Sequence, residues 1–413
     1  MMNVEHTLPV ILALIPLVLG IVGKVTAISF LAFRSIGLIT IGVLGGGLVY
    51  MQSALEIDPS RMFLSGAVLL TGFSVILGGE ETKHSSIHCA SIMIVLGLGL
   101  GVLLSQGLVS RFFLSGLLGY TAVSLFQAKH RSFRTTISLL HIAVAIILSL
   151  GSSFGGQTFH ILASLFLAVT FLPLAPFHLP FVGTIKDAKG SLASFWIVVW
   201  LIVGLGQLHE IYSSLTPNML FALSLLALVS AVYASLAALG QRLNSLFVAS
   251  ATVAHVALVW GLLEVFPSFP KWGIPFGITL AFVMGGISLA FSFVRQRYGW
   301  RTLGKLPGLA SPMPRFGVAM VLLVGFALFL PLFPTFSGLM VMPTIDIHDV
   351  EIIPISFLFL VVWLGGGWYF LQMLHQTAFG EARSDVPYFD LRLSEFFAVS
   401  ALLLGAAYSG MIY

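Results

Sequence analysis

The chain of 413 residues is 58% hydrophobic and only 8% charged, with a formal net charge of +4. A soluble domain carries about 25% charged residues, so this composition excludes a soluble enzyme, a nucleic-acid-binding domain and a disordered chain. The one cysteine, Cys89, excludes a disulfide framework and a cysteine-based metal site. We therefore expect a polytopic membrane protein that holds no metal and no cofactor.

Apolar stretches of about 20 residues, the length that crosses a bilayer, recur along the whole chain. The fold class that they predict is an all-α polytopic membrane protein with about 14 transmembrane helices. No polar connection between them is long enough to form a soluble domain. The expected spans are 7–23, 35–53, 62–79, 87–107, 110–127, 135–153, 157–177, 190–208, 217–239, 244–265, 272–294, 316–342, 352–375 and 393–412.

The basic residues are distributed unevenly between the two sides of these spans. Of the 19 lysines and arginines, only Arg61, Arg111 and Lys271 fall in even-numbered loops. Because positively charged loops stay in the cytoplasm, we expect both termini on the non-cytoplasmic side of a bacterial-type inner membrane. The basic loops are expected to contact lipid headgroups or a partner subunit, and no nucleic acid.

Two of the apolar segments contain a pair of prolines. Pro173 and Pro176 lie in the seventh segment, and Pro331 and Pro334 lie in the twelfth. Proline inside a helix removes an amide donor and clashes with the preceding turn, so both helices are predicted to be broken. Broken helices at matching positions of inverted repeats indicate a transport site; two unrelated packing kinks are the alternative.

The breaks lie five segments apart, an odd number, so segments 4–8 and 9–13 are predicted to form two inverted five-helix repeats. This arrangement gives the chain three N-terminal helices, the two repeats, and a C-terminal loop with the last helix. The corresponding ranges are 1–86, 87–208, 209–375 and 376–413.

The surroundings of the first break resemble a known motif, P-x-x-P-x-H. Pro173 to His178 (PLAPFH) is followed by Lys186-Asp187-Ala188, and three further matches come in the family's order. They are Arg242 to His255 (RLNSLFVASATVAH), Pro331 to Leu339 (PLFPTFSGL), and Phe379-Gly380 with Glu395. The chain thus resembles the antiporter-like membrane subunits of respiratory complex I and of Mrp-type cation/proton antiporters.

The resemblance implies a proton path along buried charged residues, and here those charges are missing. Ser115 stands at the position of the family's helix-5 glutamate, Phe171 at that of a lysine before the prolines, and Leu339 at that of a later glutamate. The stretch 192–206 holds no ionisable residue. The resemblance therefore indicates a divergent member in which proton translocation is reduced or lost.

No acidic or basic residue other than histidine lies in the middle of a span. The candidates for an ion path are therefore His178, His255 and His141. For each of them, a structural hydrogen bond is the alternative. His178 follows the paired proline, so we expect it to cap the broken helix or to lie at the cytoplasmic mouth of its cavity.

Charged residues near the span ends complete the candidate set. Lys186, Asp187 and Lys189 are expected to form a charged loop at the cytoplasmic mouth, where a local salt bridge or a partner contact is the alternative to ion entry. Glu210 lies near a non-cytoplasmic span end and is expected to be solvated.

The sequence contains no nucleophile elbow, zinc-protease motif or phosphate loop, so no intrinsic catalysis is expected. The leading hypothesis is a membrane subunit of a complex I-related respiratory or ion-translocating assembly, such as an NADH:quinone oxidoreductase. Its partners would be other integral membrane subunits, lipids, and a peripheral redox or carbon-handling subunit. The alternatives are the membrane subunit of a proton-coupled transporter, such as a two-component inorganic-carbon uptake system, and a structural anchor for a peripheral enzyme.

Overall fold

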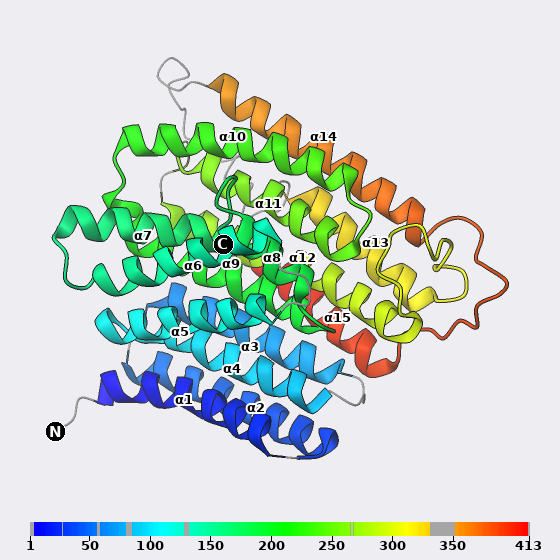
Figure 1. The fold of residues 1–413 in the computed structure, drawn as a ribbon, viewed down its shortest axis with the longest axis horizontal. Helices are drawn as coiled ribbons and strands as arrows, with labels where there is room; N and C mark the ends of the chain where they lie inside the picture. Colours follow the sequence, from blue (N-terminus) through cyan, green and yellow to red (C-terminus); the bar gives the residue numbers. More distant parts are fainter. Residues whose placement is uncertain are drawn as a thin grey trace.

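The computed structural model shows a bundle of helices that run side by side, with their axes close to one direction (Figure 1). It describes residues 4–26, 28–55, 58–79, 85–127, 132–264, 266, 268–330 and 352–411. Within these ranges the chain forms fifteen α-helices, one turn of 3-10 helix and no β-strand. The helices are α1 (Val4–Val25), α2 (Phe30–Leu55), α3 (Pro59–Leu77), α4 (Ser85–Leu104), α5 (Gly107–Phe126), α6 (Phe133–Gly151), α7 (Gln157–Phe171), α8 (Leu179–Asp187), α9 (Leu192–Ile211), η1 (Tyr212–Ser214), α10 (Pro217–Gly240), α11 (Asn244–Leu262), α12 (Phe269–Tyr298), α13 (Pro314–Phe329), α14 (Ile352–Thr377) and α15 (Leu393–Met411).

The helices agree with the spans expected from the sequence. Twelve of them are long and apolar enough to cross a membrane, and α7 and α13 are shorter apolar helices at the two proline-containing segments. The prediction of about 14 membrane segments is confirmed. The additional helix, α8, occupies a stretch that was expected to be a loop, because nine residues with few apolar positions give no span signal.

Burial divides the bundle into a centre and a periphery. Nearly every residue of α4, α9, α11 and α12 is buried, whereas most residues of α1, α2 and α6 reach the outer surface. That surface is apolar: Phe112 on α5 and Leu236 on α10, for example, are more than half exposed. An apolar exterior fits hydrocarbon tails as its solvent.

The helix contacts repeat in the order that the sequence predicts. In the first set, α4 packs against α5 and α9, and α7 packs against α6 and α9. In the second set, α10 packs against α11 and α14, and α13 packs against α12 and α14. The second break cannot be compared in the same way, because Pro331, Pro334 and Leu339 lie outside the described residues.

A buried ion pair joins α12 to α15. The carboxylate of Glu395 accepts a hydrogen bond from the guanidinium of Arg297 and another, of 2.8 Å, from the backbone N–H of Arg392. Both charged side chains of the pair are nearly inaccessible. Each therefore depends on the other for compensation of its charge.

Replacing Glu395 by Gln is expected to destabilise the protein by about 3–5 kcal/mol, because it leaves the buried guanidinium of Arg297 without its anion. Thermal unfolding of the detergent-purified protein measures the effect. The matched control is Asp385→Asn, which breaks the exposed Arg383–Asp385 pair and should leave the melting temperature almost unchanged. Equal melting temperatures for the two variants would contradict this account.

Candidate ion pathway at the broken helix

The first proline pair breaks a helix as predicted. Helix α7 ends at Phe171 and α8 begins at Leu179. Three side chains from other helices satisfy backbone groups around the break. The indole N–H of Trp200 donates to the carbonyl of Thr170 at 2.9 Å, and that of Trp260 donates to the carbonyl of Leu172 at 3.0 Å. The third contact runs from the N–H of Ala175 to the hydroxyl of Ser230, at 2.9 Å.

An aromatic core fills the position of Phe171, where the resemblance leads us to expect a lysine. Phe171 is completely buried, and its ring centroid lies 4.9 Å from that of Trp200. Phe181 of α8 packs on the same tryptophan from 6.0 Å. These contacts include no polar group that could pair with the ammonium group of a lysine. This part of the break is therefore a hydrophobic core.

His141 joins α6 to α7 through a single hydrogen bond. Its Nε2 lies 2.8 Å from the hydroxyl of Thr170, and this hydroxyl donates its own proton to the carbonyl of Phe166. The hydroxyl must therefore accept from the imidazole, whose Nε2 carries the proton. The ring also stacks on Phe166 at 5.0 Å. These contacts match the structural alternative for this histidine.

His255 is buried between α11 and α14. Its Nδ1 lies 2.9 Å from the carbonyl of Ala251 and 3.1 Å from the hydroxyl of Tyr369. Since a carbonyl can only accept, Nδ1 carries the proton and Nε2 is unprotonated. A Cβ added at Gly366 would lie 3.6 Å from Nε2, so the ring faces the glycine-rich side of α14.

His178 occupies the N-cap position of α8, but its side chain makes no capping bond. The side chain therefore does not cap the helix, and the alternative, a place at the cytoplasmic mouth of a cavity, stays a prediction. A cavity of about 190 Å³ is lined by His178, Arg134, Lys186 and Asp187, among others. Among the described residues, the buried Nδ1 atom of His178 has no hydrogen-bond partner, and the ring lies edge-on to Tyr233 at 5.2 Å.

The charged residues beside this cavity were expected to form a loop, but two of the three belong to a helix. Lys186 and Asp187 belong to the last turn of α8, and Lys189 follows it. The two lysines are exposed and Asp187 is half-buried. Burial raises the pKa of the Asp187 carboxyl, while the charge of Lys186 acts in the opposite direction. No ion pair within the described part of the chain joins these three residues.

The structure does not connect the three histidines into a relay. In the described residues, His141 bonds to Thr170 and His255 to Tyr369 and Ala251, while His178 lies at the cavity. Ser115, where the resemblance leads us to expect a glutamate, has a buried hydroxyl oxygen with no partner among the described residues. A hydroxyl does not ionise near neutral pH, so it cannot replace a carboxylate in a relay.

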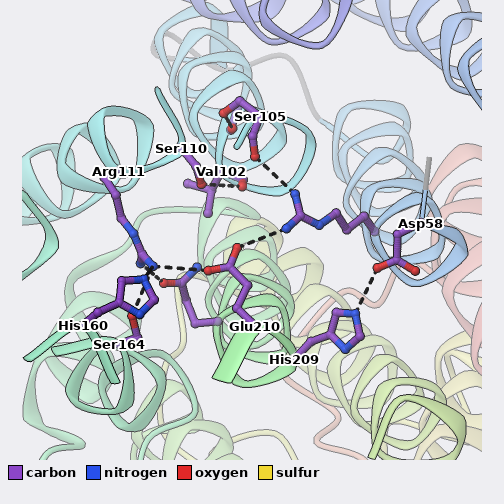
Figure 2. Close-up of polar contacts among 12 residues, drawn as sticks. Asp58, Val102, Ser105, Ser110, Arg111, His160, Ser164, His209 and Glu210 are labelled. Carbon is purple, nitrogen blue, oxygen red and sulfur yellow. Dashed lines mark hydrogen bonds and ion pairs between the residues drawn. The ribbon is translucent and has the colours of Figure 1, made fainter. Parts of the chain in front are cut away.

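The sequence analysis missed an ionic network at the opposite end of the bundle, where α3, α5 and α7 begin (Figure 2). Arg111 donates to Gln207 at 2.5 Å, to Ser164 at 3.1 Å and to Glu210 at 3.3 Å. Arg61 reaches the other oxygen of the same carboxylate at 3.4 Å. Glu210 is solvent-accessible, as expected, with a side chain that is 25% exposed; what the sequence did not predict is that its carboxylate bridges two arginines.

A signal for this network was present in the distribution of charge. Arg61 and Arg111 are two of the three basic residues that depart from the charge asymmetry of the loops, and Glu210 belongs to the same expected side. Basic residues that depart from the positive-inside pattern need a reason to be there. Pairing with a carboxylate supplies this reason.

The chain is similar to known proteins in both sequence and structure. The chain is 26% identical over 294 residues to NAD(P)H-quinone oxidoreductase chain 4 1 of Synechococcus sp. (strain JA-3-3Ab), over 62% of this chain and 54% of that protein. It superposes on a chain of respiratory complex I from Thermus thermophilus with a TM-score of 0.80 and 18% identity, over 97% of this chain and 95% of the other. The chain resembles the antiporter-like subunits in sequence and has their fold.

A chain of the Mrp complex from Dietzia sp. DQ12-45-1b gives a TM-score of 0.73 at 14% identity, over 99% of this chain and 93% of the other. No protein-family model matches the chain. The chain spans about half the length of the curated relatives that it matches. The resemblance seen in the motifs is therefore confirmed by both sequence and fold.

Replacing Phe171 by Lys is expected to destabilise the protein by several kcal/mol, because it buries an ammonium group among aromatic rings with no counter-ion. Replacing Phe171 by Leu keeps the site apolar and should cost about 1–1.5 kcal/mol. Thermal unfolding and the yield of folded protein in detergent measure both. If the lysine variant is as stable as the leucine variant, the break holds water, and the description of a dry core is wrong.

Proposed function

We propose that this antiporter-like chain serves as an integral membrane subunit of a complex I-related respiratory or ion-translocating assembly, and that proton translocation through the chain itself is reduced or lost. The observation that carries the proposal is the packing of Phe171 against Trp200 at the break. In this place the resemblance leads us to expect a lysine. A buried aromatic pair can neither bind a proton nor orient water for its transfer.

The polar groups along the break support the same conclusion. A proton relay needs groups that bind and release protons and that contact one another directly or through water. Here Thr170, Leu172 and Ala175 have their backbone groups occupied by tryptophan and serine side chains. The backbone polarity that a broken helix offers to ions is thus used for packing.

The proposed place in a larger assembly follows from the relatives and from the surface. The curated relative is named as a chain of a quinone oxidoreductase, and the solved structures that share the fold are named as complexes. Catalysis would then belong to partner subunits, including a peripheral redox subunit. We propose the same membrane orientation that the loop charges predict, with basic loops in the cytoplasm.

One observation favours a second candidate, the membrane subunit of a proton-coupled transporter. The cavity at His178 brings an imidazole with an unpartnered Nδ1 beside Arg134 and Asp187. Such a group could exchange protons with the aqueous side, and a peripheral carbon-handling subunit would be the corresponding partner. This candidate requires His178 to be essential for transport.

Proton flux into liposomes that contain the purified chain and a pH-sensitive dye, under an imposed potential, is expected to equal that of empty liposomes. The His178→Ala and His255→Ala variants should give the same rate as the wild type. An added protonophore confirms that each preparation reports flux. A flux above the empty-liposome rate that His178→Ala abolishes would refute the proposed loss of conduction and establish the second candidate.

Purification of the tagged chain from its native membranes in a mild detergent tests the assembly. We expect several other integral membrane subunits and redox subunits to co-purify. The apolar lateral surface offers contacts to the membrane subunits, and the basic loops offer contacts to the peripheral redox subunits. Mass spectrometry identifies them, and Glu395→Gln serves as a control for co-purification that depends on a folded chain. Recovery of one large zinc protein as the only partner would support the transporter instead, and recovery of a single peripheral enzyme would support an anchor.

A further inference from the structure

We propose that the chain binds a phosphate-class oxyanion in a cavity at the end of the bundle where α3, α5 and α7 begin. This cavity, the arginine pocket, has a volume of about 730 Å³. Its polar lining comes chiefly from Arg61, Arg111, Ser153, Gln157, His160 and Glu210. The inference is independent of whether the broken helix conducts protons.

The charges that line the arginine pocket do not balance. Two guanidinium groups, of Arg61 and Arg111, face one carboxylate, of Glu210. The neighbouring carboxylate of Asp58 is engaged by His209 at 3.0 Å and is not part of the lining. The pocket therefore carries an excess positive charge that an anion would compensate.

The carboxylate that bridges the arginines is held loosely. Glu210 lies 3.4 Å from Arg61 and 3.3 Å from Arg111, whereas charge-assisted hydrogen bonds of this kind are about 2.7–2.9 Å long. The side chain of Glu210 is also a quarter exposed. The side chain of Arg61 is 21% exposed, and its contacts with Glu210 and with the carbonyl of Ser105 are both 3.4 Å long. A second anion can therefore approach this guanidinium.

Arg111 is fixed in position before any ligand binds. Only 5% of its surface is exposed. Gln207 of α9 and Ser164 of α7 accept hydrogen bonds from its guanidinium. A planar guanidinium matches the geometry of a phosphate or carboxylate oxygen pair. Pre-organisation of this kind lowers the entropy lost on binding.

Two helix N-termini add to the positive potential. Helices α5 and α7 begin at Gly107 and Gln157, which both line the pocket. Neither cap residue, Gln106 or Gly156, provides a side-chain capping bond. The first-turn N–H groups and the helix dipoles of both helices therefore favour an anion at this point.

The rim of the arginine pocket is apolar and exposed. Phe154 is 81% exposed and Leu108 is 41% exposed, and both line the cavity. Such a rim fits the level at which lipid headgroups meet acyl chains. The oxyanion could thus be the phosphate of an anionic phospholipid or a free anion such as inorganic phosphate, and the chemistry that recognises it is the same.

Two binding experiments on the detergent-purified full chain distinguish these sources. Native mass spectrometry measures the retention of added phosphatidylglycerol, and isothermal titration calorimetry measures the affinity for inorganic phosphate. Arg61→Gln removes one guanidinium and is expected to weaken binding of the relevant probe about tenfold, the effect of one charge-assisted hydrogen bond. Arg61→Lys, which keeps the charge, should recover part of the affinity.

A second variant leaves all native bonds of the network in place. Ser153→Asp puts a carboxylate at the exposed rim and should weaken binding through repulsion, whereas Ser213→Asp, exposed on η1 and outside the lining, should not. If Arg61→Gln does not fold, the comparison of Ser153→Asp with Ser213→Asp tests the proposal. Weaker retention of phosphatidylglycerol alone assigns a lipid site, and weaker binding of phosphate alone assigns a free-anion site. Failure of both probes to bind the wild type, or unchanged binding in the variants, would overturn the proposal.

Discussion

A helix that breaks within lipid must find partners for the backbone groups that it frees, and the rest of this bundle is arranged around that requirement. Trp200 comes from α9, Trp260 from α11 and Ser230 from α10, so helices of both repeats converge on the break between α7 and α8. Water could have met the same need. Because side chains do so instead, two of them tryptophans, the space around Phe171 is filled and this residue becomes part of a continuous core.

The ion pairs lie at the two ends of the bundle, away from its apolar centre. At one end, Arg297 and Glu395 compensate each other, and at the other, Glu210 bridges Arg61 and Arg111. A charge in the hydrocarbon region is costly unless it is paired or serves a function. In the described structure, both ionic groups join helices; the Arg297–Glu395 pair is nearly inaccessible, whereas Arg61 and Glu210 are partly exposed. The chemistry that this chain offers is therefore concentrated at its ends.

The likeness to chains of complex I and of an Mrp complex shows that one arrangement of helices can form from very different sequences. The same arrangement of helices forms at 18% and 14% identity, with an apolar core at a position where the resemblance leads us to expect a lysine. Helix packing depends on the shape and volume of apolar side chains, which many sequences satisfy, whereas a relay depends on individual titratable groups. A shared fold therefore does not by itself establish a shared function.

The sequence by itself determined the number of membrane segments and the place of the first break. Both follow from local properties, because hydropathy is read over one segment and proline acts on its own turn. Only the tertiary structure decided what fills the break and which charges pair. Arg111 and Gln207 are 96 residues apart, and Arg61 and Glu210 are 149 apart. No local pattern specifies such contacts, since they exist only after the helices have packed and brought the ends of separate segments together.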